Sequence, residues 1–457
     1  MLAVPIRGGI DLWQHSALKA DDSEAWNPYP VRGPFFDVNH FGAKADNATL
    51  NTPAFTRAFA ACRAAGFGYV RVPAGAYRTG RVELASGCYL LLQPHAIIQG
   101  STEQSDYGSD WDYWSIVFGR NVSNTGVISP TADGLASGGE IRGILWQLVV
   151  GYDAQANDFK QRRWPGNEDD PCRGVCKPGN LFLQDATNIT VMSVSLTESA
   201  GWTQIYRRVS NLLADRLIVR NSVQWGTGDG MDVESGSNLT FANSVMKTGD
   251  DNLAFRSGSF VYLRTPWPAG PIAPVSRVRV RNMTLTSSSS AIKFEQSVLP
   301  VAEKYEVGDI HDVCVEDVKI LDTNRGIGIW QRTSHGALRD MVFRRINMTT
   351  RFDSKPGFWG AGEPLFVSSL GPMPSPLIRN LTFESISAIS ENGALLSSLP
   401  VEQPSAVANV SLLDVRITIQ RTGNITKPKG KDYEVRAANS SGVSVSIAIS
   451  VYYSSSC

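Results

Sequence analysis

The chain has no long hydrophobic run and no excess of charge of either sign. No stretch of about 18 apolar residues occurs in it, so we expect no transmembrane helix and no membrane partner. The 43 Lys and Arg residues balance the 43 Asp and Glu residues, which argues against a nucleic-acid-binding protein. Apolar residues still make up 42% of the 457 positions, enough to exclude disorder for most of the chain.

Cysteine and histidine are scarce. No second Cys/His pair stands at the spacing of zinc ligands, so we predict no metal site. The pairing of the cysteines stays open, although two of them are close enough in sequence for a small loop bridge. The six cysteines are Cys62, Cys88, the close pair Cys172 and Cys176, Cys314 and Cys457.

Two features of the sequence give opposite indications of whether the protein is secreted. The first residues lack the apolar stretch of a signal peptide. Ten Asn-X-Ser/Thr sequons, if they are glycan acceptors, indicate a secreted or cell-wall protein, which we favour. Alternatively, these asparagines belong to turns that precede strands. They are Asn47, Asn121, Asn188, Asn238, Asn282, Asn347, Asn380, Asn409, Asn424 and Asn439.

One helix is predicted near the start of the chain. Thr52 is expected at its N-cap and Pro53 at its first turn. Phe55, Phe59 and Cys62 then recur with helical spacing and form one apolar stripe. Gly66 is expected to end this helix.

After about residue 180 a turn residue, often Asn, repeatedly precedes a short alternating strand. Asn188, Asn211 and Asn238 begin three copies, 23 and 27 residues apart. Short strands at such intervals, without helices between them, are typical of a β-solenoid whose end the predicted helix would cap. A β-sandwich would need hairpin turns, and Asn392-Gly393 is the only Asn-Gly dipeptide. We predict an all-β fold, a single-stranded parallel β-helix with an N-terminal capping helix. It divides into an arm (1–34), the β-helix (35–425) and a C-terminal tail (426–457).

Three aspartates on neighbouring coils are the candidate catalytic residues. Asp229 and Asp250 are 21 residues apart, close to one coil, and Asp251 adjoins Asp250. Adjacent residues point to opposite faces of a regular strand, but a bend at Gly249 would let both aspartates face outward. Clustered acids of this kind suit glycoside hydrolysis, in which one carboxyl protonates the leaving oxygen and another activates water. A coil step of about 4.8 Å with a sideways offset would reach the about 6.5–9.5 Å separation of inverting enzymes.

These motifs resemble glycoside hydrolase family 28, the polygalacturonases, and most closely the plant-type members. The family's Asn-Thr-Asp-Gly corresponds to residues 227–230, and its Thr-Gly-Asp-Asp is intact at 248–251. Residues 36–46, 72–80 and 100–102 match further family stretches, so the resemblance runs in order from about 35 to 415. It implies a pectin lyase-like, right-handed parallel β-helix. It also implies that Asp250 is the general acid and that Asp229 and Asp251 hold and activate the water.

The chain departs from the family pattern in three places. Thr227 replaces the first Asn, Ser290 stands about where the family has its His, and no His occurs between 200 and 300. The family's Arg-Ile-Lys, which grips the uronate carboxylate, aligns with residues 328–330, Gly-Ile-Trp. Nearby residues could take over substrate binding, or the cations among them could be ordinary solvated charges. The candidates are Arg256, Lys293, Arg325, Trp330 and Arg332; Trp330 would either stack on a sugar or pack against a loop.

Three functions agree with the sequence. The prediction is an inverting glycoside hydrolase, monomeric and without cofactor, acting on pectic or related cell-wall polysaccharide. A calcium-dependent lyase is the first alternative, with aspartates binding Ca²⁺ and Arg256 as base. The second is a non-catalytic carbohydrate-binding β-helix, which the missing His and Arg-Ile-Lys would favour.

Overall fold

A computed structural model describes most of the chain from residue 33 onwards, and residues 34–457 form one compact unit. The predicted arm lies almost wholly outside the described residues, as do Cys172, Cys176 and Cys457. The described ranges are 33–108, 115–130, 138–153, 158–161, 177–257, 273–296, 308–331, 336–352, 360–370, 377–399, 407–421, 435–438, 440–441 and 444–453.

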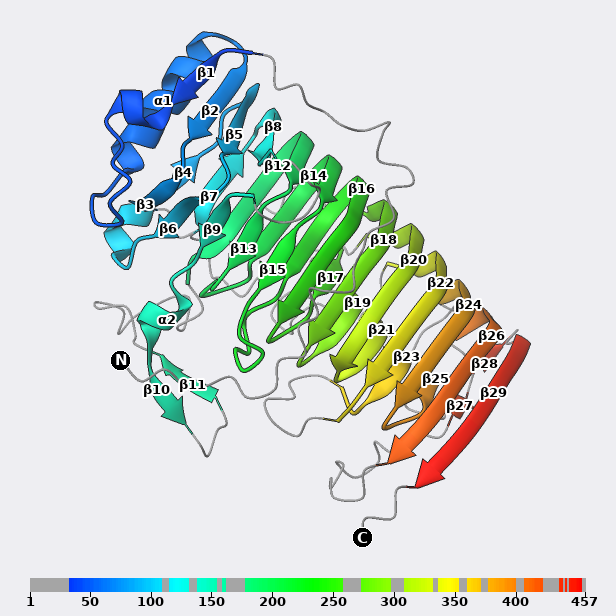
Figure 1. Cartoon of the computed structure of the whole chain (residues 1–457). Helices are drawn as coiled ribbons and strands as arrows, with labels where there is room; N and C mark the ends of the chain where they lie inside the picture. Colours follow the sequence, from blue (N-terminus) through cyan, green and yellow to red (C-terminus); the bar gives the residue numbers. More distant parts are fainter. Residues whose placement is uncertain are drawn as a thin grey trace. The chain divides into compact units, whose positions relative to one another are not determined.

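The described chain is built almost entirely of parallel strands that stack coil upon coil (Figure 1). The first strands are β1 (Phe35–Asp37), β2 (Gly68–Val72), β3 (Gly75–Thr79), β4 (Val82–Glu83), β5 (Cys88–Leu92), β6 (Ala96–Gly100), β7 (Ser115–Arg120), β8 (Ser123–Ile128) and β9 (Glu140–Arg142). A separate antiparallel pair, β10 (Val149–Asp153) and β11 (Asp158–Gln161), follows.

Longer strands form the middle and the end of the stack. Those in the middle are β12 (Gly179–Met192), β13 (Ser195–Thr197), β14 (Gln204–Asp215), β15 (Ile218–Arg220), β16 (Met231–Thr248), β17 (Leu253–Arg256), β18 (Val275–Ser287), β19 (Ser290–Gln296), β20 (Ile310–Thr323), β21 (Arg325–Gln331), β22 (Leu338–Thr350) and β23 (Glu363–Leu370). The last are β24 (Ile378–Ser390), β25 (Ala394–Leu399), β26 (Val407–Arg421), β27 (Val435–Ala438), β28 (Ser440–Ser441) and β29 (Ser444–Tyr453).

The parallel pairings confirm the predicted β-helix. On one face, β7, β12, β14, β16, β17, β19, β21, β23, β25 and β27 pair in this order. We call this row the first face. Strands of the predicted C-terminal tail continue the stack, because β29 pairs with β26 beyond residue 425.

The core lies inside the coils, where alternate apolar side chains of each strand meet those of the next. Phe255 on β17 and Phe294 on β19 stack with ring centroids 4.9 Å apart, and both are buried. Because side chains alternate along a strand, the residues on either side of each phenylalanine in its own strand face outward on the first face. The packing of the core therefore fixes which polar side chains line that face.

The predicted turn asparagines form a ladder along the stack. Asn188, Asn211 and Asn238 all have left-handed backbone conformations, with φ of 56°, 55° and 59°. Asn238 donates to the side-chain oxygen of Asn211 at 2.8 Å, and Asn211 donates to that of Asn188 at 2.9 Å. They lie within β12, β14 and β16 instead of in turns before strands, and each bends its strand through a left-handed conformation, which Asn tolerates better than most residues with a Cβ. Glycan attachment at the sequons stays a prediction.

The helix α1 (Thr52–Ala64) packs against β1, β2, β4 and β5 at the N-terminal end of the stack (Figure 1). Its buried stripe includes Phe55, Phe59 and Cys62, as predicted. A disulfide joins Cys62 to Cys88 on β5, so the cap is covalently tied to the coil beneath it. A short helix α2 (Leu145–Leu148) and two 3₁₀ turns, Val38–Phe41 and Gln104–Tyr107, complete the described helical structure.

The predicted start of α1 is wrong by one residue. Asn51, not Thr52, is the N-cap. The Asn51 side chain makes no capping bond because it accepts from the Lys44 amide at 2.7 Å and donates to the Lys44 carbonyl at 3.0 Å. Thr52 instead accepts a hydrogen bond from the Gly80 amide at 2.9 Å. Both side chains therefore bind neighbouring loops instead of capping the helix.

Candidate active site

The three predicted aspartates lie at the start of two neighbouring strands of the first face. Asp229 comes just before β16, while Asp250 and Asp251 lie in the bend between β16 and β17. The parallel register pairs Met231 with Leu253, which brings the residues that precede both strands together. The amide of Gly230 donates to the carbonyl of Asp251 at 2.8 Å and ties the two coils at this point.

Gly249 is required at the bend by a close backbone approach. A Cβ atom on Gly249 would lie 2.1 Å from the carbonyl oxygen of Trp225 and 2.5 Å from that of Ser222. Any side chain would push the bend away from the preceding coil. The glycine therefore lets the chain turn tightly enough for Asp250 and Asp251 to leave the regular alternation of a strand.

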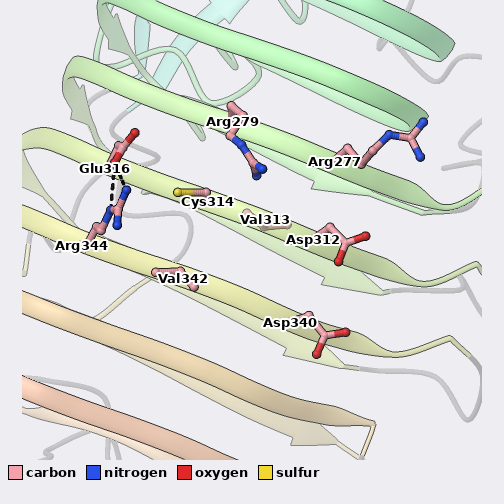
Figure 2. Close-up of a pocket in the computed structure, with 9 residues that line it drawn as sticks. All are labelled: Arg277, Arg279, Asp312, Val313, Cys314, Glu316, Asp340, Val342 and Arg344. Carbon is pink, nitrogen blue, oxygen red and sulfur yellow. Dashed lines mark hydrogen bonds and ion pairs between the residues drawn. The ribbon is translucent and has the colours of Figure 1, made fainter.

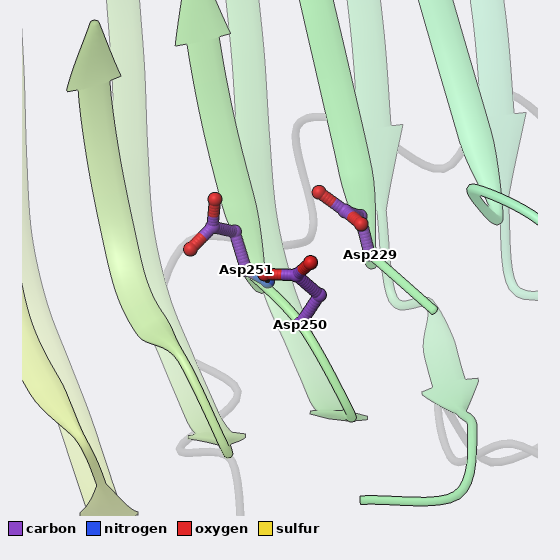
Figure 3. A group of neighbouring side chains, drawn as sticks. All are labelled: Asp229, Asp250 and Asp251. Atoms are coloured by element: carbon purple, nitrogen blue, oxygen red, sulfur yellow. The ribbon is translucent and has the colours of Figure 1, made fainter. Parts of the chain in front are cut away.

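The carboxyl groups of Asp229, Asp250 and Asp251 form one cluster (Figure 3). One oxygen from each lies within 4.8 Å of the others. Asp229 and Asp251 are buried, whereas Asp250 keeps part of its surface exposed. The Oδ1 atom of Asp229 is buried and has no hydrogen-bond partner among the described protein atoms. The cluster is closer than the separation of about 6.5–9.5 Å that the coil step predicted.

Two of the three carboxyls have raised pKa values. Burial, helped by the nearby Asp251 carboxylate, raises the pKa of Asp250 to about 7. Burial also raises the pKa of Asp229 well above its usual range, helped by repulsion from Asp232, Asp250 and Asp251. Close carboxylates disfavour joint ionisation, so the cluster retains protons that isolated aspartates would lose.

Asp251 is the ionised member of the cluster. Its Oδ2 lies 3.1 Å from the Lys293 ammonium, and its Oδ1 accepts from the Ser289 hydroxyl at 2.9 Å and the Ser290 amide at 3.1 Å. Burial acts to raise the pKa of Asp251, but Lys293 and Arg256 outweigh it and lower the pKa. A carboxyl with a raised pKa and an ionised carboxylate thus stand side by side, an arrangement that can support general acid–base catalysis.

The structure brings two of the predicted substrate-binding cations to the aspartates. Arg256 forms an ion pair with Asp232 and lies 3.8 Å from both Asp229 and Asp251. Lys293, on the next strand, contacts Asp251. The alternative of ordinary solvated charges is wrong for both, because Arg256 is 6% exposed and Lys293 is 4% exposed.

Arg325 and Trp330 form a second cluster two strands further along the first face from β17. The Arg325 guanidinium binds Glu363 at 2.6 Å and lies over the rings of Trp330 and Phe366, at 4.6 and 4.1 Å. Arg325 is 3% exposed and Trp330 is 7% exposed, so neither is a solvated surface residue. Arg332, the remaining predicted residue, lies outside the described residues.

Three site residues were missed from sequence: Asp232, Ser289 and Glu295. Glu295 accepts from the Lys293 ammonium at 2.9 Å and is 3% exposed. The signal was present, because Lys293 and Glu295 are two positions apart on a strand whose other face carries Ile292 and Phe294. Two outward charges on one face of a strand indicate a paired polar site. Asp232 and Ser289 carried no comparable signal.

A hollow of about 510 Å³ opens elsewhere, on the face formed by β18, β20 and β22 (Figure 2). Arg277, Arg279, Arg344 and three carboxyl groups line it with Cys314. Glu316 in its wall pairs with Arg344. Burial acts to raise the pKa of Glu316, but its hydrogen bonds to arginine outweigh burial and lower the pKa. Among the described residues, three carboxyl oxygens come within 4.8 Å of one another in the aspartate cluster and not in the hollow, so the cluster is the better candidate for acid–base chemistry.

The family model of "Glycosyl hydrolases family 28" matches residues 62–351. The chain belongs to glycosyl hydrolases family 28. Asp229, Asp250 and Asp251 all lie within the matched region. This family 28 chain nevertheless has Ser290, Gly328 and Trp330 where the resemblance led us to expect His, Arg and Lys.

Relatives and solved structures agree with this family. The chain is 26% identical to a "Probable polygalacturonase" of Vitis vinifera, over 79% of this chain and 69% of that protein. It is 27% identical to a "Polygalacturonase" of Malus domestica, over 68% of this chain but 59% of that protein, less than two thirds of its length. The fold is similar to that of an exopolygalacturonase from Thermotoga maritima, with a TM-score of 0.63, 15% identity and 92% of each chain covered. An exopolygalacturonase of Yersinia enterocolitica gives a TM-score of 0.59 at 17% identity, covering 92% of this chain and 78% of that chain.

Proposed function

We propose that this family 28 chain hydrolyses glycosidic bonds in pectic or related cell-wall polysaccharide, with inversion at the anomeric carbon. The observation that carries the proposal is the juxtaposition of a part-exposed carboxyl whose pKa is raised to about 7 by burial, Asp250, with an ionised carboxylate, Asp251. Their pKa values are pushed apart by different surroundings, which is how two acids of one type take opposite roles.

In the proposed reaction Asp250 gives its proton to the glycosidic oxygen as the bond from that oxygen to the anomeric carbon breaks. A water attacks the same carbon from the opposite side and loses a proton to Asp251. Asp229 positions this water. Two oxygens up to 4.8 Å apart can share one water, because two hydrogen bonds of about 2.8 Å span that distance. No organic cofactor is needed for these steps.

The surroundings of Asp251 support hydrolysis over the calcium-dependent alternative. Lys293 and Arg256 already supply positive charge to Asp251, and Arg256 is engaged by Asp232 instead of being available as a base. Arg256 has its pKa raised, because the carboxylates around it outweigh the effect of burial. An arginine held so firmly protonated is poorly suited to abstract a proton.

The location and assembly of the protein belong to the same proposal. A disulfide such as Cys62–Cys88 is typical of an oxidising compartment, which supports secretion or a cell-wall location. None of the described helices is long and apolar enough to cross a membrane. We propose a monomer whose partner is the polysaccharide itself, with the β-helix as its catalytic domain.

The test is release of reducing ends from polygalacturonan, rhamnogalacturonan, xylogalacturonan and neutral glucans or galactans. Wild type is compared with Asp250→Asn and with Asp312→Asn, a control in the wall of the separate hollow. We expect Asp250→Asn to lose about 10²–10⁴-fold in rate, the usual contribution of a general acid, and Asp312→Asn to keep its rate. Calcium-dependent release of unsaturated ends would indicate the lyase, and binding without release the non-catalytic module.

A further inference from the structure

The cations beside the three aspartates are bound to carboxylates of the protein itself. Lys293 bridges Asp251 at 3.1 Å and Glu295 at 2.9 Å. Arg256 pairs with Asp232, and its Nε lies 3.9 Å from Glu295. Each of these cations therefore already meets more than one negative group before any substrate arrives.

The place that the family resemblance reserves for a substrate-binding arginine is filled by Arg325. A Cβ atom on Gly328 would lie 3.0 Å from Cδ of Arg325, so the Arg325 chain occupies the space above the glycine. Its guanidinium is turned to Glu363, with Nε at 3.0 Å and an Nη at 2.6 Å from one carboxylate oxygen. Both partners are buried, Glu363 at 1% exposure. This cation is therefore neutralised inside the protein.

The neighbouring position carries an aromatic ring where the resemblance predicts a lysine. Trp330 pairs directly with Glu295 across β19 and β21. Its ring contacts Phe366 edge-on at 5.4 Å between centroids and has the Lys293 ammonium 5.4 Å from its own centroid. The chain thus has a neutral, partly aromatic wall where the resemblance predicts two substrate-facing cations. This wall is formed by Gly328, the ion pair of Arg325 with Glu363, and Trp330.

We propose that the sugar ring bound at the three aspartates is uncharged, either a neutral sugar or a uronic acid whose carboxyl group is esterified. A free uronate bound here would face the carboxylates of Asp251 and Glu295. The described cations that could form an ion pair with it, Lys293 and Arg256, already interact with those two carboxylates. Bringing a further anion into a buried site without a cation of its own carries a large desolvation cost. The arrangement therefore selects against a free carboxylate by leaving it uncompensated. This inference rests on the proposed function, since it names the substrate of the same site.

The first test measures binding, so that it does not depend on turnover. The Asp250→Asn variant is titrated at pH 6 with short oligogalacturonides as the free acid, with the same oligomers methyl-esterified, and with neutral galacto-oligosaccharides. At this pH Asp250 is mostly protonated, because its pKa is raised to about 7 by burial, so the substitution preserves charge. We expect the esterified or the neutral oligomer to bind at least about tenfold more tightly than the free acid, as one uncompensated charge pair implies. Equal or tighter binding of the free acid would overturn the inference, as would a lack of binding to all three.

The second test changes the charge of the site. Glu295→Gln, made in the Asp250→Asn background, removes the carboxylate that lies 2.9 Å from the Lys293 ammonium and keeps Asp251 at 3.1 Å, so more of the Lys293 charge is available to a free carboxylate of the ligand. We expect the preference for the uncharged oligomer to fall by about tenfold or more. Glu316→Gln, in the wall of the separate hollow, is the matched control and should leave the preference unchanged. An unchanged preference in folded Glu295→Gln would contradict the role given to this pair.

Failure of this inference is distinguishable from failure of the proposed function. Rapid cleavage of unesterified polygalacturonan, abolished by Asp250→Asn, would retain the hydrolase and overturn the uncharged sugar. Selective binding of an uncharged oligomer without cleavage by wild type would retain the specificity and overturn the hydrolase. In the binding test, comparison of the neutral with the esterified oligomers then decides whether the uncharged ring is a neutral sugar or an esterified uronic acid.

Discussion

The Lys293 ammonium lies 3.1 Å from Oδ2 of Asp251, and both groups are buried. Among the described residues, no cation forms an ion pair with the carboxylate of Asp250, the adjacent residue in the chain. A contact made by one of two neighbouring aspartates thus sends their pKa values in opposite directions. In the proposed mechanism this difference makes Asp250 the acid and Asp251 the base.

Removal of Lys293 should weaken the base. Lys293→Met leaves Asp251 buried with less positive charge beside it, so we expect its pKa to rise. The acidic limb of the rate profile should move to higher pH by the same amount, and at a pH below both limbs kcat/KM should fall about tenfold for each unit of that move. The measurement is kcat/KM against pH on a polymer that wild type cleaves. Lys319→Met, at an exposed position of β20, is the control, and an unmoved acidic limb would remove Asp251 as the base.

The wild-type profile should be bell-shaped with its alkaline limb near neutrality. Burial and the Asp251 carboxylate raise the pKa of Asp250 to about 7, so the general acid is lost as the pH rises through that value. The acidic limb should lie below the usual range of an aspartate, because Lys293 and Arg256 overcome burial and lower the pKa of Asp251. Initial rates between pH 3 and pH 9 measure both limbs. Full activity at pH 9 would show that Asp250 is not the acid.

Stereochemistry tests how the water is held. The shortest distances between the carboxyl oxygens are below those usual for inverting enzymes, but they suit a water shared by Asp229 and Asp251. We therefore expect the first product released to have the inverted anomeric configuration. Proton NMR of the anomeric signals during the first turnovers decides the matter. A retained configuration would instead make one of these aspartates a nucleophile that forms a covalent glycosyl intermediate.

The sequence was sufficient for the fold and the acids because both depend on short-range spacing. The 21-residue interval from Asp229 to Asp250 matches one coil, and the structure pairs Met231 with Leu253 on these coils. The partner of Arg256 on the following strand was not predictable in this way. Arg256 pairs in register with Glu295, 39 positions later, because residues 257–274 and the strand β18 separate β17 from β19. Spacing alone cannot give the register across a connection of unknown path.

Contacts between residues far apart in the sequence also explain why the predicted start of α1 was wrong and why the cations are buried and paired instead of solvated. Asn51 and Thr52 both suit an N-cap, and contacts to Lys44 and Gly80 decide between them. Arg325 reads as a surface charge in the sequence, yet Glu363 on the next coil buries it. Local patterns give residue types and faces, whereas long-range pairing decides which charges are neutralised.

The raised pKa of Asp250 also predicts how its replacement changes stability. The folded-state pKa, raised to about 7 by burial, exceeds the ordinary value of about 3.9 in the unfolded chain, so the folded state binds more protons between these values. Its contribution to stability is therefore present below about pH 4 and is lost as the pH rises through 7. Asp250→Asn should be more stable than wild type at pH 8, by up to about 4 kcal/mol for a pKa difference of about 3 units, with little difference at pH 4. Urea unfolding at both values measures this, with exposed Asp312→Asn as control; a benefit independent of pH would contradict the assignment.

The Cys62–Cys88 disulfide should stabilise the capped end of the β-helix. It closes a loop with a sequence separation of 26 and joins α1 to β5, and cross-links of this size typically contribute about 3 kcal/mol by restricting the unfolded chain. The double variant Cys62→Ala, Cys88→Ala should therefore unfold at a lower urea concentration and expose the end of the stack that α1 covers. Cys314→Ala is the matched control, since Cys314 is a free cysteine of β20. Equal midpoints for wild type and the double variant would mean that packing of the Phe55 and Phe59 stripe alone holds the cap, because this apolar face remains when the disulfide is removed.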